Sequence, residues 1–118
     1  MLFHEEEENT IAFLEDYEDS TPVQKLVMTF EQGDKYLCHY LEMFESDNGG
    51  DLDIEPEDPR WDDFWMMVYE VDEILKPGPN FEPVGNCLLL TYAHFPTLIT
   101  TEAGEQIYPP SPSAHVSE

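Results

Sequence analysis

A row of acids between residues 51 and 57 is the most distinctive chemical pattern in the chain. Acids occupy every second position there: Asp51, Asp53, Glu55 and Glu57. Side chains two residues apart on an extended strand point to the same side, about 6.6 Å from each other. An extended segment would therefore present these carboxylates as a regular row, with Leu52 and Ile54 anchoring its other side. Ordered anions of this kind offer a basic protein something similar to a phosphate backbone.

More acids follow on a segment with helical periodicity. Residues 59–76 place their apolar side chains on one broad half of a helical wheel, Asp58 and Pro59 suit its start, and prolines stop it after Lys76. The sequence thus predicts a partner-binding surface made of the acidic row, the adjoining loop and the exposed helix face. Its predicted residues are Asp47, Asp51, Asp53, Glu55, Glu57, Asp58, Asp62, Asp63, Tyr69, Glu70, Asp72 and Glu73.

Asp72 is the exception on this helix, because it falls inside the apolar half of the wheel, between Trp61 and Trp65. A carboxylate in such a position must pair, take up a proton or reach the edge of the apolar face. One interpretation is that Asp72 simply reaches solvent near the helix end. The other is an acid among aromatic residues at the centre of a binding patch, where an Arg or Lys of the partner docks.

Patterns for metal binding or catalysis are weak. An EF-hand frame that starts at Asp47 has Gly49 at its third position, so it lacks a ligand there. The four histidines lie far apart, neither cysteine belongs to a CxxC pair, and phosphate-binding glycine loops are missing. Cys38 and His39 are adjacent, but neighbours on a strand point to opposite faces. The sequence predicts no catalytic residue, no metal and no cofactor.

The charge balance restricts the kind of partner. The chain of 118 residues has 27 acidic residues against four Lys and Arg, which gives a net charge of −23. Counterion release from nucleic acid needs clustered basic residues, and anionic membranes repel a chain of this charge, so neither is an expected partner. A field of one sign steers association with a basic protein. The plain alternative is a solvated acidic face that only keeps the protein in solution.

The remaining segments predict an α+β fold. A small, mostly antiparallel sheet of about five short strands packs against the long amphipathic helix over residues 59–76. Residues 10–17 fit a short helix or a strand about equally well. The predicted strands are residues 24–31 and 35–45, which form a hairpin, residues 86–95, which lie centrally, and residues 97–101 and 105–108, which form a second hairpin.

These elements form one domain over residues 1–108, with residues 1–8 as a frayed acidic end and residues 109–118 as a disordered tail rich in Pro and Ser. Cys38 and Cys87 lie in apolar runs and are expected to be buried thiols, although pairing between them stays open. The N-terminus has no signal-peptide pattern, and no apolar stretch approaches the ~20 residues of a membrane span. The expected compartment is therefore the cytoplasm.

No stretch matches a family motif, so the hypothesis for the function rests on physical type alone. The first hypothesis is a small acidic inhibitor that neutralises a basic nucleic-acid-processing protein, above all an immunity protein against a bacterial nuclease toxin. The alternative is a phage-encoded DNA mimic that blocks a restriction, CRISPR or DNA-repair enzyme. A metal-dependent enzyme built on the carboxylates and an acidic adaptor domain are the third and fourth hypotheses.

Overall fold

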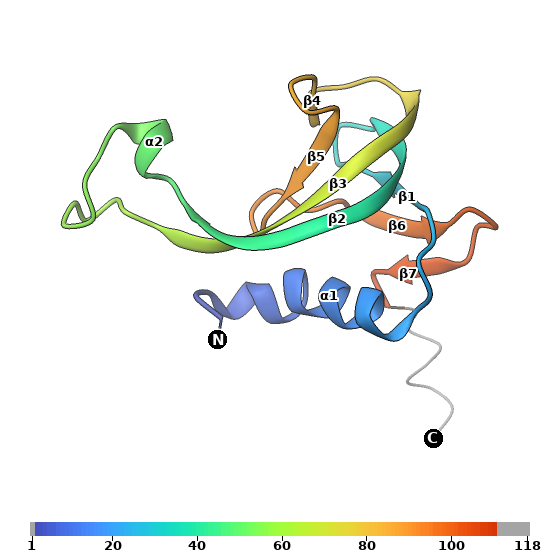
Figure 1. Cartoon of the computed structure of the whole chain (residues 1–118), viewed down its shortest axis with the longest axis horizontal. Coiled ribbons are helices and arrows are strands. Elements are labelled where there is room, and N and C mark those ends of the chain that lie inside the picture. Colours follow the sequence, from blue (N-terminus) through green and yellow to red (C-terminus); the bar gives the residue numbers. More distant parts are fainter. Residues whose placement is uncertain (1, 111–118) are drawn as a thin grey trace.

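The computed structural model describes residues 2–110, and a single antiparallel sheet dominates it (Figure 1). Seven strands follow the order β4-β5-β3-β2-β1-β6-β7, and every neighbouring pair is antiparallel. The strands are β1 (Leu26–Thr29), β2 (Lys35–Asp47), β3 (Asp63–Lys76), β4 (Phe81–Glu82), β5 (Cys87–Leu90), β6 (Leu98–Thr101) and β7 (Gln106–Tyr108).

Strands β2 and β3 form a hairpin much longer than the rest of the sheet. They pair from Lys35 and Lys76 at one end to Asp47 and Asp63 at the other. Strand β1 pairs with β2 only as far as Cys38, and β5 pairs with β3 only over residues 67–70. The far part of the hairpin, residues 44–66, therefore projects beyond the sheet as a two-stranded arm (Figure 1).

The helix predicted for residues 59–76 is wrong, because this segment is strand β3. Its residues also alternate with period two: Met67, Tyr69 and Val71 are buried, while the residues between them face the other side. Apolar residues on both faces imitate a helical stripe when only the sequence is considered. The segment is rich in aromatic and β-branched residues, which favour strands, and β2 supplies a partner along its full length.

The predicted fold class is wrong for the same reason. The sheet has seven strands instead of about five, and no long amphipathic helix packs on it within residues 2–110. The helical elements that are present are a 3-10 turn over Glu5–Glu8, helix α1 (Ile11–Ser20) and helix α2 (Gly49–Leu52). The two predicted hairpins are confirmed as β1–β2 and β6–β7. Residues 11–17 belong to helix α1 rather than to a strand, and Thr10 is the residue that precedes the helix.

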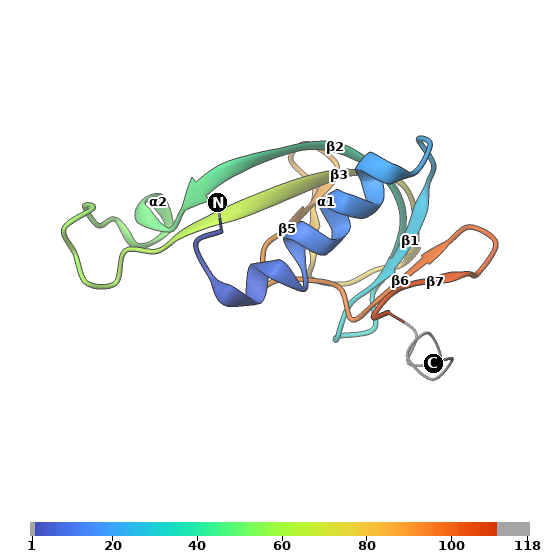
Figure 2. The same cartoon turned by 90° about the horizontal axis from the view of Figure 1, so that it is seen from below.

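Helix α1 covers the inner face of the sheet (Figure 2). Ile11 and Leu14 of this helix are completely buried. The sheet contributes the rest of the core: Leu26, Met28, Phe30, Tyr36, Cys38, Met67, Tyr69, Val71, Leu88, Leu90 and Ile99. Tyr69 also ties the sheet to α1, since its hydroxyl donates a hydrogen bond to the carboxylate of Glu18. The opposite, outer face of β2, β3 and β5 has no helix over it in the described part of the chain.

The acidic N-terminal segment is held to the sheet by a buried carboxylate. Glu7 is completely buried, and its Oε1 accepts the backbone N–H groups of Phe3 at 2.8 Å and His4 at 3.0 Å. Its Oε2 accepts the N–H of Trp65 at 2.7 Å, just beyond the last β3 residue that pairs with β5. Residues 1–8 were expected to fray. Instead, the carboxylate of Glu7 accepts a backbone N–H of β3 beyond the residues that pair with β5, and it thereby holds this segment on the sheet. Of the predicted tail, residues 111–118 lie outside the described residues.

A second buried carboxylate fixes the turns at the other end of the sheet. Asp34, between β1 and β2, is 1% exposed and accepts the Tyr36 hydroxyl at 2.6 Å and the backbone N–H of Asn80 at 3.1 Å. Burial acts to raise the pKa of Asp34, but these hydrogen bonds outweigh it and leave the pKa below its ordinary value. Gly78 packs so closely that an added Cβ would lie 2.3 Å from Cβ of Asp34.

Both cysteines are free and buried, as expected, but they lie on opposite faces of the sheet. Cys38 pairs in register with Val71 and belongs to the core, whereas Cys87 pairs with Glu70 on the outer face. A bridge between them would have to pass through the sheet. Burial raises the pKa of both thiols. None of the helices in the described residues is long and apolar enough to cross a membrane.

Candidate functional site

The regular row of carboxylates predicted over residues 51–57 is not present. Gly49 to Leu52 form helix α2, and Asp53 then takes a left-handed conformation with φ of 54°. Turns and irregular backbone continue to Arg60, so the segment is not an extended strand with one acidic side. Leu52, expected to anchor the row, is 45% exposed. The glycines and Asn48 at the start of this segment favour a tight turn of the chain over an extended strand.

The arm nevertheless gathers eight of the twelve predicted partner-binding residues, all between positions 47 and 63. They are Asp47, Asp51, Asp53, Glu55, Glu57, Asp58, Asp62 and Asp63. Arg60 is the one basic residue among positions 47–63, and it is engaged with Asp58 through Nε–Oδ1 and Nη2–Oδ2 contacts of 3.1 and 2.9 Å. This contact lowers the pKa of Asp58. The outer end of the arm is therefore a concentrated anionic surface whose own base is already paired.

The end of the arm has a defined shape. Asn48 joins the two strands, because its side-chain oxygen accepts the N–H of Asp62 at 2.8 Å. Gly49 is buried beneath Trp61, and a Cβ added to it would lie 2.4 Å from the indole ring. The indole N–H of Trp61 in turn donates to Oδ1 of Asp63 at 3.0 Å. These contacts hold the acidic loop on the two strands.

The other four predicted residues lie on β3 inside the sheet rather than on the arm. Tyr69 belongs to the core and offers no surface to a partner; burial and the nearby Glu18 raise its pKa. On the outer face, His39 contacts Glu70 through Nε2 at 3.1 Å and Asp72 through Nδ1 at 2.8 Å. Asp72 therefore both pairs and reaches solvent, since it is exposed and Lys25 also lies 3.9 Å away. Glu73 is exposed next to this cluster.

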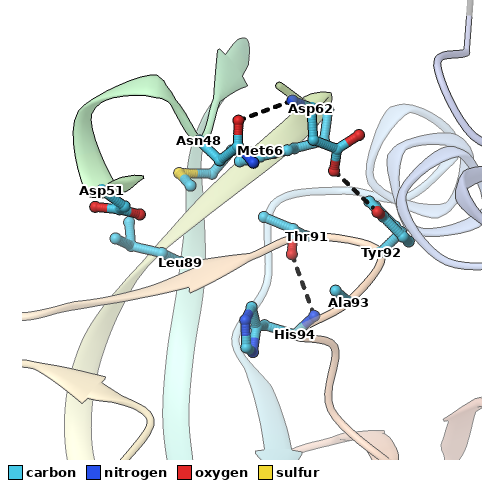
Figure 3. Close-up of a pocket in the computed structure, with 10 residues that line it drawn as sticks. Asn48, Asp51, Asp62, Met66, Leu89, Thr91, Tyr92, Ala93 and His94 are labelled. Atoms are coloured by element: carbon cyan, nitrogen blue, oxygen red, sulfur yellow. Dashed lines mark hydrogen bonds between the residues drawn. The ribbon is translucent and has the colours of Figure 1, made fainter. Parts of the chain in front are cut away.

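A cleft of about 340 Å³ lies where the arm leaves the sheet (Figure 3). Its lining residues are Asn48, Asp51, Asp62, Phe64, Met66, Leu89, Thr91, Tyr92, Ala93 and His94. The apolar lining comes from β3 and β5, one wall comes from the arm, and the turn after β5 forms the opposite wall. The residues of this turn were missed, since the sequence predicts a continuous strand to residue 95. Only the fold brings positions 91–94 beside positions 48–66, and no sequence signal marks this contact.

The side chain of Asp62 is fixed at the edge of this cleft by two other segments, the turn after β5 and the N-terminal segment. Its Oδ2 accepts the Tyr92 hydroxyl at 3.0 Å, and its Oδ1 lies 2.6 Å from Nε2 of His4. The His4 ring stacks on Tyr92 with 4.1 Å between ring centres. Burial, followed by the contact with Asp62, raises the pKa of Tyr92. Asp51 stands across the cleft on α2 and is exposed (Figure 3).

Within residues 2–110, no group of three or more His, Cys, Asp or Glu side chains is arranged to hold a metal ion. Comparisons of the chain with protein-family models, with curated proteins and with solved structures give no match. The site is an anionic projection with a partly apolar cleft at its base.

Proposed function

We propose that the protein is a small acidic inhibitor that binds and neutralises a basic nucleic-acid-processing protein. The leading case is an immunity protein that acts in the cytoplasm against a bacterial nuclease toxin. The observation that carries this proposal is the arm, where eight acids and a single, internally paired base occupy residues 47–63 of a projecting hairpin.

The shape of the arm supports binding in a recess of the partner. A two-stranded ribbon that projects from a sheet is narrower than the body of the protein, and nucleic-acid-binding clefts are lined by Lys and Arg. An anionic projection competes with the nucleic acid for such a cleft. Concentrated charge also raises association rates, toward 10⁸–10⁹ M⁻¹s⁻¹ at low salt. A fast rate suits an inhibitor that must reach its target before damage occurs.

The phage-encoded DNA mimic gains no specific observation from the structure. The regular row of carboxylates expected over residues 51–57 would have favoured the mimic and the immunity protein alike, and α2 and turns take its place. The metal-dependent enzyme has no arranged set of ligands within the described residues. We therefore do not advance either as a second candidate.

Affinity capture from the source cell tests the proposal with a matched pair of variants. In the arm variant, four exposed acids become amides: Asp51→Asn, Asp53→Asn, Glu55→Gln and Glu57→Gln. The control variant loses the same charge elsewhere: Glu5→Gln, Glu8→Gln, Glu102→Gln and Glu105→Gln, all exposed. The wild-type chain and the control should capture one basic protein, and the arm variant should not.

The captured protein is then assayed for cleavage or binding of nucleic acid. We expect one equivalent of the wild-type chain to inhibit it, with an association rate that falls steeply as salt is added and a dissociation rate that changes little. Equal capture by both variants would remove the arm from the proposal. A captured protein with no activity toward nucleic acid would remove the proposed function.

A further inference from the structure

The cleft at the base of the arm combines features that solvent-facing sheet surfaces rarely have together. Phe64 and Met66 project from the outer face of β3, and Leu89 of the adjacent β5 is 39% exposed. An uncovered sheet face normally carries polar side chains. Here an apolar surface is left open directly beneath carboxylates, so the cleft is suited to a side chain that is apolar along its stem and cationic at its end.

We infer that this cleft receives one arginine side chain of the basic partner. The inference rests on the proposed function and names the partner group that the cleft would hold. The methylene stem of an arginine would lie on Phe64, Met66 and Leu89, and its guanidinium group would lie between Asp51 and Asp62. The volume of about 340 Å³ is at the small end of ligand pockets, enough for one long side chain.

The carboxylates favour a cation over any other occupant. An uncharged apolar side chain would remove water from Asp51 and Asp62 without replacing it, which is costly. Asp62 is already oriented by Tyr92 and His4, and a carboxylate has about four acceptor positions, so it can still accept from a guanidinium group. A rigid acceptor loses less conformational entropy on binding than a free side chain does.

Arginine fits the cleft better than lysine. A guanidinium group is planar, offers five N–H donors in a fixed fork and stacks on aromatic faces, whereas an ammonium group is a compact, strongly hydrated point charge. The cleft has two carboxylates and also the rings of Phe64 and Tyr92 in its lining. A guanidinium group that donates to both carboxylates while it stacks on an aromatic ring would contact both the acids and the rings of the cleft.

A peptide titration followed by amide NMR tests the inference without the partner. The probes are three capped tripeptides, Gly-Arg-Gly, Gly-Lys-Gly and Gly-citrulline-Gly, the last being nearly isosteric with the first but uncharged. We expect the arginine peptide to shift the amides of Leu89, Thr91 and Ala93 in a saturable way, and the citrulline peptide to leave them in place. Shifts of equal size with lysine or citrulline would overturn the assignment to arginine.

The matched variants are Asp51→Asn and Asp53→Asn, two exposed acids of the arm of which only Asp51 lines the cleft. Asp51→Asn should weaken binding of the arginine peptide about tenfold, as loss of a charge-assisted hydrogen bond does, and Asp53→Asn less than twofold. Equal losses would mean diffuse attraction to the arm and would refute the cleft. Failure of the two proposals is distinguishable, because the wild-type chain can still capture a partner through the arm if no peptide enters this cleft.

Discussion

Replacement of Glu7 by alanine should strongly destabilise the protein, although replacement of most other acidic residues in the chain should change the stability little. Glu7 is the one completely buried acid of the N-terminal segment, and its carboxylate accepts three backbone N–H groups within 3.0 Å. The donors come from two parts of the chain that lie far apart in the sequence: Phe3 and His4 are close to Glu7, and Trp65 is 58 residues away from it. Removing the carboxylate should therefore detach the N-terminal segment from β3.

The expected loss of stability depends on whether the backbone N–H groups that Glu7 accepts can find another acceptor. Phe3 and His4 can donate to water once the segment is loose, but the N–H of Trp65 loses this acceptor in a partly buried place, at a cost of about 1–3 kcal/mol. The segment also loses the contact of His4 with Asp62 and the approach of Phe3 to Trp65, whose rings lie 6.0 Å apart. Together we expect Glu7→Ala to lower the free energy of unfolding by about 3 kcal/mol, and Glu7→Gln, which keeps one acceptor, by about 1.5 kcal/mol.

Urea unfolding followed by circular dichroism measures this difference, with Glu8→Ala as the matched control. Glu8 belongs to the same 3-10 turn and carries the same charge, but it is exposed. The control should change the stability by less than about 0.5 kcal/mol in either direction. For a chain of this size, 3 kcal/mol corresponds to roughly 10 °C in melting temperature. Similar stabilities for Glu7→Ala and Glu8→Ala would refute the role assigned to the buried carboxylate.

Three further predictions concern packing, pH and salt. Gly78→Ala should destabilise by about 2 kcal/mol because its Cβ would meet Asp34, while Gly50→Ala, with nothing within 4 Å, should be neutral; equal melting temperatures would contradict this. Hydrogen bonds lower the pKa of Asp34 in the folded protein. The ionised carboxylate therefore stabilises the fold at pH values above its pKa in the unfolded chain, near 3.9, and this stabilisation is lost as pH falls through its pKa in the folded protein. The difference in urea midpoint between the wild-type chain and Asp34→Asn should therefore become smaller from pH 7 to pH 3. A constant difference would show that ionisation of Asp34 does not stabilise the fold. Finally, a net charge of −23 should make the melting temperature of dilute protein rise with added NaCl, and a flat response would mean that charge repulsion does not limit stability.

Local signals in the sequence predict the hairpins well and the longest strand badly. The turn at Gly33 is flanked by alternating residues, and its pairing is decided by neighbours in the sequence. Strand β3 differs because both of its faces carry apolar residues, the inner ones for the core and the outer ones for the cleft. The sequence of β3 therefore lacks the alternation of apolar and polar residues that identifies a strand with one solvated face. Its pairing with β2, which extends to Asp47 and Asp63, is a tertiary property that no local pattern contains.

The acids of the candidate site were found because charge is visible in composition, but their arrangement was not. Alternation over residues 51–57 suggested a strand, while the glycines before it and the left-handed Asp53 close a compact loop. The carboxylates of Glu7 and Asp34 became important only through burial. In a chain with 27 acids, nothing in the sequence separates these two from the solvated ones.

The strand edges of the arm that pair with no further strand affect how copies of this chain interact with each other. Beyond Cys38 on β2 and Met67 on β3, each of the two strands pairs, within residues 2–110, only with the other. The N-terminal segment reaches β3 there through Glu7 at Trp65 and His4 at Asp63. Bare strand edges invite edge-to-edge association, and like charges are a common protection against it. The anions that we propose for attraction of a basic partner would thus also keep neighbouring molecules apart. Replacement of the exposed arm acids by amides, which removes this charge while the strand edges stay open, should therefore increase self-association through β-strands, as sedimentation would measure.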